Sequence, residues 1–380
     1  MNATRLYTLK YGGFKQVLSI GRVQTPTLAM IVHRDLEIEN FVSKPFWELQ
    51  TTYRDTIFNY AKGRFEKIED GQQLLQKVKD SEFTITSIER KEGKEYSPRL
   101  FDLTSLQVFC NKRYSYTADQ TLKLVQKLYE MKVVTYPRVD TTYLPVDQHP
   151  KVKGIMQGMK SYRQFTSQVL SKPIKKSKRI FDDKKVTDHH AIIPTGKESN
   201  LQGGHANVYD AIARRFIANF YPECKVANTT AKGTASAIEF KATGKEILDP
   251  GWRILFPKST KKTDDKKNAK DNILPQFEVG EQGPHDPALV EKKTQPPKHF
   301  TEATLLRGME TAGKQVDDDE LRELMKANGI GRPSTRAAII ETLYRRKYII
   351  RRKKNLLASD VGKQLIGTIR NKLLTSVELT

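Results

Sequence analysis

Apolar and polar positions change their period several times along the chain, and each change marks a predicted element. Apolar residues recur at helical spacing over 26–36, beginning at Pro26, which favours a helix start. Over 46–53 and 82–88 apolar and polar residues alternate with a period of two, as in half-buried strands. A helical block is predicted to begin near Leu103.

This first helical block contains one well-marked helix start. Thr117 and Gln120 have the spacing of a capping box. Leu122, Val125 and Tyr129 follow at helical spacing and are predicted to form one apolar face.

The second half of the chain changes from helix to strand and back to helix. An amphipathic helix is predicted over 208–220, and strand-like alternation follows at 229–240 and continues to 252–256. The Lys-rich stretch 258–271 has no periodicity and is predicted to be an exposed loop, and a second helical block begins near Thr301. The order helical, β, helical, β, helical indicates nesting, with a helical insertion inside a β domain.

Composition points to a polyanionic partner. The 380 residues include 66 Lys and Arg against 44 Asp and Glu, a net charge of 66 − 44 = +22. This excess favours nucleic acid, while solvated Lys-rich loops are the plain alternative. No stretch approaches the roughly 20 apolar residues of a membrane span. Cys110 and Cys224 have no C-x-x-C spacing, which excludes a zinc ribbon and a disulfide framework.

The segment 128–145 carries the most informative chemistry. Pro137 biases Tyr136 toward an extended conformation, so Arg138, two residues on, is predicted to point the same way as Tyr136. A phenol beside a guanidinium suits attack on a phosphodiester, provided that a base or positive charge activates the phenol. The chain has 15 tyrosines, and a packing or exposed tyrosine is the alternative.

The string itself is more specific than its residue types. Thr-Tyr-Pro-Arg-x-Asp followed by Tyr-Leu-Pro resembles the active-site signature of type IA DNA topoisomerases. Other segments resemble motifs of that family in the same order: 2–5, 18–28, 101–107, 188–195, 294–305 and 329–336. The Thr-Pro-Thr-Leu-Ala after Gly-Arg-Val-Gln is most similar to the bacterial topoisomerase III branch.

The resemblance implies a role for each matching residue. Tyr136 would be the nucleophile that forms a 5′-phosphotyrosine bond, Arg138 would hold the scissile phosphate, and His189 would hydrogen-bond a phosphate or position the strand near the break. The alternative for His189 is a core or loop histidine with satisfied hydrogen bonds. Residues that would line a strand-binding groove are Arg22, Gln24, Thr301, Glu302, Thr304, Arg332, Ser334 and Thr335. Thr301 and Ser334 are also placed to cap helices, and capping and phosphate contact can coexist.

The fold implied by the resemblance is a multidomain α and β toroidal core with nested connectivity. A helical base domain would comprise 1–42 and 295–380, a β arch domain 43–98 and 226–294, and a helical domain with the active-site tyrosine 99–225.

The family also has an acidic Toprim domain that binds Mg²⁺, and this sequence starts after that position in the family pattern. We therefore expect a core fragment with Mg²⁺ in the intact enzyme and no metal site of its own. The run 317–320 contains Asp-x-Asp but precedes a helix predicted over 321–327, whose N-terminus the carboxylates would complement.

The function implied is single-strand DNA cleavage, strand passage and religation without ATP, and the fragment alone would bind single-stranded DNA but cleave poorly. We expect a monomer in the bacterial cytoplasm, associated with the nucleoid. The alternatives are a non-catalytic basic nucleic-acid-binding module, and a tyrosine recombinase or other phosphodiesterase.

Overall fold

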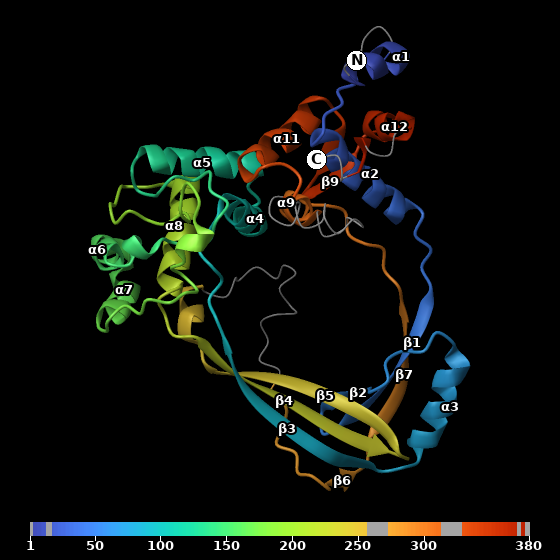
Figure 1. Cartoon of the computed structure of the whole chain (residues 1–380). Helices are drawn as coiled ribbons and strands as arrows, with labels where there is room; N and C mark the ends of the chain where they lie inside the picture. The colour runs from blue at the N-terminus through green and yellow to red at the C-terminus, as the bar shows by residue number, and fades with distance from the viewer. Residues whose placement is uncertain (1–2, 13–16, 257–272, 313–328, 371–373, 377–380) are drawn as a thin grey trace. The chain divides into compact units, whose positions relative to one another are not determined.

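The chain folds into two compact units, each of which is built from separate stretches of sequence. The computed structural model describes residues 3–12, 17–256, 273–312, 329–370 and 374–376 (Figure 1). Unit 1 comprises Met1–Phe41, Pro98–Phe220 and Pro297–Thr380, and unit 2 comprises Val42–Ser97 and Tyr221–Pro296. The predicted division into five segments and three domains stays a prediction.

Unit 2 is an antiparallel sheet with one helix against it. Within the described residues the sheet has seven strands in the order β6-β3-β4-β5-β2-β1-β7. The strands are β1 Pro45–Tyr53, β2 Thr56–Tyr60, β3 Phe83–Glu95, β4 Cys224–Ala235, β5 Ile238–Asp249, β6 Gln282–Gly283 and β7 Asp286–Lys293. The helix α3, Ile68–Lys79, contacts β1 and β7 (Figure 1).

The sheet explains how a long helical segment can interrupt it. β3 and β4 are neighbours, and Glu95 at the end of β3 pairs with Cys224 at the start of β4. The helical segment 98–220 therefore leaves and re-enters the sheet at adjacent strands, so the strand pairing is preserved across the insertion. One face of the sheet buries an aromatic core around Phe58, Phe83 and Phe240.

Two predictions for unit 2 are corrected. The alternating run 229–240 is two strands, because the chain turns at Ser236 and Ala237, both of which have positive φ. The stretch 252–256 belongs to a short 3-10 helix, η4 Gly251–Leu255, and is no strand. Pro250 and the positive φ of Gly251 end the extended backbone there. The pattern also missed α3 and β7.

Unit 1 is mainly helical. Its described helices are α1 Ala3–Tyr11, α2 Gln24–Glu39, α4 Leu103–Tyr114, α5 Ala118–Glu130, α6 Lys151–Gly158, α7 Arg163–Leu170, α8 Gly203–Ala218, α9 Glu302–Thr311, α11 Pro333–Arg345 and α12 Asp360–Thr368. Short 3-10 helices are η1 Val146–Gln148, η2 Lys160–Tyr162 and η3 Asp183–Lys185, and a hairpin is formed by β8 Ile349–Arg352 and β9 Asn355–Ala358. None of the helices in the described ranges is long and apolar enough to cross a bilayer.

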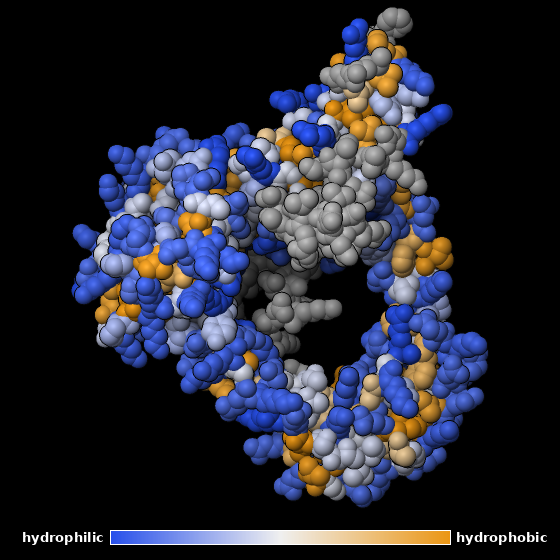
Figure 2. All heavy atoms as spheres, in the orientation of Figure 1, coloured by the Kyte–Doolittle hydropathy of each residue, from blue (hydrophilic) through white to orange (hydrophobic). Residues whose placement is uncertain are grey.

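Buried polar side chains connect the elements of unit 1 through hydrogen bonds and an ion pair. Asp35 on α2 is 2% exposed; its carboxylate accepts from the Ala358 amide at 2.7 Å and pairs with His299 Nδ1 at 2.8 Å. Arg336 on α11 is also 2% exposed and donates to the Thr104 hydroxyl at 3.0 Å, so α11 is bonded to α4. Hydrophilic residues cover most of the face seen in Figure 2.

Two of the three helix caps predicted from the sequence are present in the structure. Thr117 caps α5 by accepting from the Gln120 amide at 2.9 Å, and Thr301 forms a capping box with Thr304 at α9. Ser334 was predicted as a cap and is not one, because the N-cap of α11 is Arg332 and Pro333 follows at the first helical turn. The predicted loop 258–271, the helix 321–327 and the run 317–320 lie outside the described residues.

The packing of β4 on β3 makes a stability prediction. A Cβ on Gly233 would lie 2.3 Å from the Phe83 ring and 2.9 Å from the Thr84 carbonyl oxygen, so Gly233→Ala should destabilise unit 2 by about 1–3 kcal/mol. The control is Gly93→Ala in β3, where the nearest atom is 3.8 Å away. Both tryptophans, Trp47 and Trp252, lie in unit 2, so tryptophan fluorescence during denaturation measures this unit. Equal stabilities of the two variants would contradict the prediction.

Candidate active site

The end of α5 turns the chain toward the candidate nucleophile. Met131 is the C-cap, Lys132 has a positive φ of 63°, and the Val133 amide donates back to the Leu128 carbonyl at 3.1 Å. This turn ends the helix with its last carbonyls satisfied and releases the following residues in an extended conformation. Tyr136 lies in this extended stretch, three residues after Val133.

The extended segment pairs with the histidine motif. Val134 bridges Pro194 in antiparallel fashion, and the Thr135 amide donates to the Ile193 carbonyl at 3.0 Å. The Thr135 hydroxyl accepts from the Ile193 amide at 3.0 Å and donates to the Ala191 carbonyl at 3.2 Å. These bonds place two motifs that are far apart in the sequence side by side.

A third motif completes this arrangement. The Ile192 amide donates to the Phe101 carbonyl at 2.8 Å, and the Leu103 amide donates to the Val139 carbonyl at 3.1 Å. Asp102 between them caps α4 by accepting from the Ser105 amide at 2.6 Å. The segments 101–107, 133–139 and 188–195 thus meet in one place.

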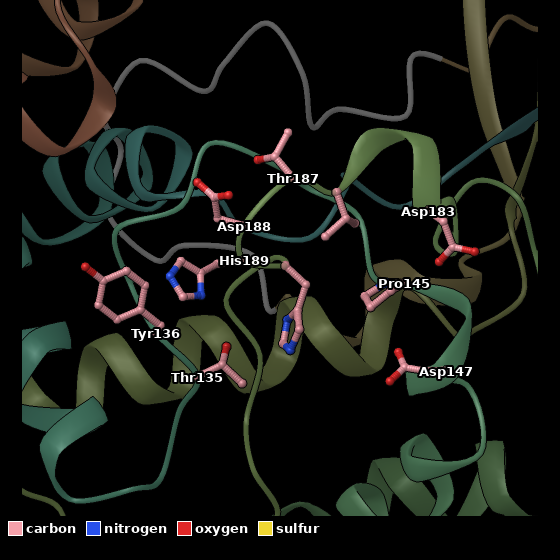
Figure 3. A pocket seen from close by; sticks show the side chains of 10 residues that line it. Thr135, Tyr136, Pro145, Asp147, Asp183, Thr187, Asp188 and His189 are labelled. Atoms are coloured by element: carbon pink, nitrogen blue, oxygen red, sulfur yellow. The ribbon is translucent and has the colours of Figure 1, made fainter.

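Tyr136 and His189 face one pocket. Their ring centroids are 4.5 Å apart at an angle of 45°, and both rings line a cavity of about 440 Å³ (Figure 3). Tyr136 is half-buried and His189 is exposed, so both can meet a ligand from solvent. The remaining lining residues are Thr135, Pro145, Asp147, Asp183, Val186, Thr187, Asp188 and His190.

The charge of this pocket is negative. Asp147, Asp183 and Asp188 line it, and its lining within the described residues contains no lysine or arginine. A phosphodiester in this pocket would meet carboxylates, so positive charge must come from outside the lining. Burial lowers the pKa of His190, which favours its neutral form.

Arg138 is a cation close to Tyr136 in the chain. Its side chain is exposed, and Nη1 donates to Gln126 Oε1 on α5 at 2.9 Å. It does not line the pocket. The guanidinium has further donors for phosphate oxygens beyond the one that Gln126 receives.

The predicted groove residues lie at helix starts in unit 1. Arg22 and Gln24 are at the start of α2, and Gln24 Nε2 is buried with no partner in the structure. Val23, between them, lies within 2.9 Å of the Cβ position of Gly331, so the starts of α2 and α11 are close together. Arg332 and Thr335 are exposed there, and Ser334 is half-buried.

Glu302 is buried, unlike the other residues that were predicted to line the strand-binding groove. It is 2% exposed; Oε2 accepts from the Ala118 amide at 2.6 Å and Oε1 forms an ion pair with Arg351. Ala118 is the first residue of α5, where a carboxylate complements the helix dipole. Burial raises the pKa of Glu302, while the Ala118 amide and Arg351 favour its charged form. Thr301 is half-buried and Thr304 exposed, with their hydroxyls engaged in the α9 cap.

The described residues contain no group of three or more His, Cys, Asp or Glu that could hold a metal ion. The side chains of the described residues therefore do not by themselves form a Mg²⁺ site.

Comparison with known proteins identifies the family. A family model described as DNA topoisomerase matches residues 1–380. The chain belongs to the type IA DNA topoisomerase family.

Two similar relatives of this topoisomerase chain are bacterial proteins. It is 35% identical to DNA topoisomerase 3 of Bacillus cereus over 98% of the chain and 53% of the relative. It is 34% identical to DNA topoisomerase 3 of Salmonella typhimurium over 97% of the chain and 60% of the relative. The chain thus spans about half the length of the curated relatives it matches.

A solved structure has the same fold. Full-length topoisomerase I from Thermotoga maritima matches with a TM-score of 0.72 at 22% identity, covering 99% of this chain and 60% of that one. The mixed α and β fold expected from the sequence is confirmed at this level.

The sequence patterns did not identify two residues near the candidate site of this topoisomerase chain, Tyr129 and Gln126. Tyr129 was assigned to an apolar face, yet it is 39% exposed and its ring lies 5.4 Å from that of Tyr136. Gln126, three residues earlier, lies on the same side of α5 and holds Arg138. The signal that was available is the i, i+3 spacing of the two residues just before the Tyr-Pro-Arg motif.

The buried position of Glu302 predicts its effect on stability. Glu302→Ala would leave the Ala118 amide without its acceptor, which should lower the free energy of unfolding of unit 1 by about 1–3 kcal/mol. Glu302→Gln keeps an acceptor oxygen and should cost less. Far-UV circular dichroism during denaturation reports this loss, because most described helices lie in unit 1.

The matched control is Glu37→Ala. Glu37 pairs with Arg34 on the exposed side of α2, so its loss should change stability by less than about 1 kcal/mol. A Glu302→Ala effect as small as that of the control would show that the buried carboxylate contributes little.

The half-buried His190 predicts a pH dependence. Because its pKa in the folded chain lies below the ordinary value of 6.5, the unfolded chain binds the proton more readily. The contribution of His190 to stability is then complete above about pH 6.5 and declines as pH falls toward the lower folded pKa. His190→Gln should flatten the decline in denaturation midpoints measured between neutral and acidic pH.

Proposed function

We propose that this chain is the part of a type IA DNA topoisomerase that binds a single DNA strand and carries the nucleophile, Tyr136. The observation that supports this most is the contact of the Tyr136 and His189 rings in a solvent-accessible pocket, in a chain of this family. Two motifs from distant parts of the sequence meet there through backbone hydrogen bonds, which place the two side chains together.

The proposed step is a transesterification. Tyr136 Oη attacks the phosphorus, a new bond forms between them, and the bond from phosphorus to the 3′ oxygen breaks. The phenol loses its proton and the leaving oxygen gains one, so the products are a 5′-phosphotyrosine and a 3′-hydroxyl. The energy of the broken bond is kept in the new ester, and the reverse attack by the 3′-hydroxyl reseals the strand without ATP.

His189 and Arg138 would act on the same phosphate. His189, beside the Tyr136 ring, would donate a hydrogen bond to a non-bridging oxygen. Arg138 would bind phosphate oxygens with the donors that remain after its bond to Gln126, and would stabilise the negative charge that grows on them.

The strand would reach this site along unit 1. Arg22, Gln24, Arg332, Ser334 and Thr335 lie near the adjacent starts of α2 and α11, where their side-chain donors would contact phosphate oxygens. Thr301 and Thr304 belong to the same proposed groove. Glu302 would support this groove by fixing the start of α5 through its bond to the Ala118 amide. The net charge of +22 favours the encounter with DNA.

Full activity would depend on groups outside this chain. The three carboxylates of the pocket oppose a phosphodiester, so we propose that a Toprim domain with Mg²⁺ supplies the missing positive charge in the intact enzyme. The toroidal arrangement, strand passage, monomeric state and location at the bacterial nucleoid belong to the same proposal.

The nucleophile is tested by Tyr136→Phe. The substitution removes one oxygen and keeps the ring, so affinity for single-stranded DNA should be unchanged. The chain, joined to the Toprim domain of a family member, should form a covalent adduct with labelled DNA in the presence of Mg²⁺, and the variant should form none. Denaturing gels measure the adduct and fluorescence anisotropy measures binding.

End-labelling the trapped adduct separates the rival functions. Attachment through the 5′ end is expected, and attachment through the 3′ end would indicate a tyrosine recombinase. If the Tyr136→Phe variant still formed adducts, a residue other than Tyr136 would be the nucleophile. Binding without any adduct in the joined protein would favour a non-catalytic nucleic-acid-binding module.

A further inference from the structure

An exposed aromatic side chain, that of Tyr129, lies beside the proposed nucleophile. Tyr129, near the end of α5, is 39% exposed, and its ring meets that of Tyr136 edge-on at 5.4 Å and 78°. Met131, two residues on, is 37% exposed. The end of α5 therefore presents apolar and aromatic surface to solvent next to Tyr136.

Groups that can hold a phosphate lie next to this surface. Gln126 and Tyr129 are three residues apart and so share one face of α5. Gln126 holds the Arg138 guanidinium at 2.9 Å, and Tyr129 contacts the Tyr136 ring. A cation, a nucleophilic phenol and an exposed aromatic ring thus converge on the end of one helix.

This combination matches the chemistry of a single strand. Each nucleotide carries an anionic phosphate and, one sugar away, a flat base with two π-faces. Proteins that bind single strands pair cations with aromatic rings on which bases stack. Because the Tyr129 and Tyr136 rings are in contact, a phosphate bound at Tyr136 would have a neighbouring base close to the exposed ring of Tyr129.

We propose that Tyr129 is a base-stacking residue of this chain, and that it binds a nucleobase adjacent to the phosphate that Tyr136 attacks. The inference rests on the proposed function and names a contact of the same site. Stacking tolerates every base, because each has a π-face, so Tyr129 would hold the strand without imposing a sequence.

The competing explanation is that Tyr129 only supports the Tyr136 ring. A supporting residue acts on the shape of the site and would affect every ligand that binds there. A stacking residue acts only on ligands that have bases. The two roles can therefore be separated by a strand that keeps its phosphates and lacks its bases.

The experiment compares two single-stranded DNAs of equal length, an oligothymidylate and an abasic strand. The chain and its variants Tyr129→Leu and Tyr129→Phe are titrated with each strand by fluorescence anisotropy at several salt concentrations. Tyr129→Leu should weaken binding to the oligothymidylate roughly tenfold and leave binding to the abasic strand unchanged. Tyr129→Phe should restore binding, because it keeps the ring. The salt dependence should keep its slope, since no phosphate contact is lost.

The control is Tyr96→Leu, which changes an exposed tyrosine in unit 2 and should alter neither affinity. An equal loss on both strands in Tyr129→Leu would overturn the inference in favour of support, and no loss on either strand would overturn it outright. Both outcomes leave the proposed function intact if the unmodified chain binds the oligothymidylate. Failure of the unmodified chain to bind that strand would overturn the proposed function and the inference together.

Discussion

The pairing of the extended segment before Tyr136 with the segment after His189 is the interaction on which the candidate site depends. Thr135 makes it in three ways, through its amide, as an acceptor for the Ile193 amide and as a donor to the Ala191 carbonyl. Side chains of an extended segment alternate between two faces, so a slip of one residue would turn Tyr136 away from His189. The double use of the Thr135 hydroxyl opposes such a slip, which explains why a threonine is useful beside the nucleophile.

The helix that precedes this segment, α5, is held by contacts at its start and at its end. At its start, the buried carboxylate of Glu302 accepts from the Ala118 amide and is itself paired with Arg351. At its end, the turn at Lys132 directs the chain into the paired segment, and Gln126 holds Arg138 beside it. Glu302 on α9 and Arg351 on β8, both from the C-terminal part of the chain, therefore help to position the site in the middle of the sequence, although neither residue lines the pocket. A buried charge that is bonded on both oxygens suits this task, because any displacement of α5 leaves it unsatisfied.

Several elements were predictable because their signals are local. The helix over 26–36 and the caps at Thr117 and Thr301 are confirmed, since periodicity and capping depend on residues within a few positions of one another. The predictions failed where a distant contact decides. Tyr129 has the spacing of a buried residue, and nothing local shows that its side of α5 faces solvent. The run 252–256 has strand-like residues, yet the turn around Gly251 makes it helical.

The sequence by itself determined the family and the residues that carry the proposed chemistry, because the motifs around Tyr136 and His189 are specific strings of residues that do not depend on the fold to be recognised. Only the tertiary structure decided which of the predicted residues lie together. It separated Glu302, buried beneath α5, from the exposed Arg332 and Thr335, and it added Tyr129 to the surroundings of Tyr136. The physical reason is that burial and contact are properties of packing between segments that are distant in sequence, and the hydrophobic period of one helix does not show what covers it.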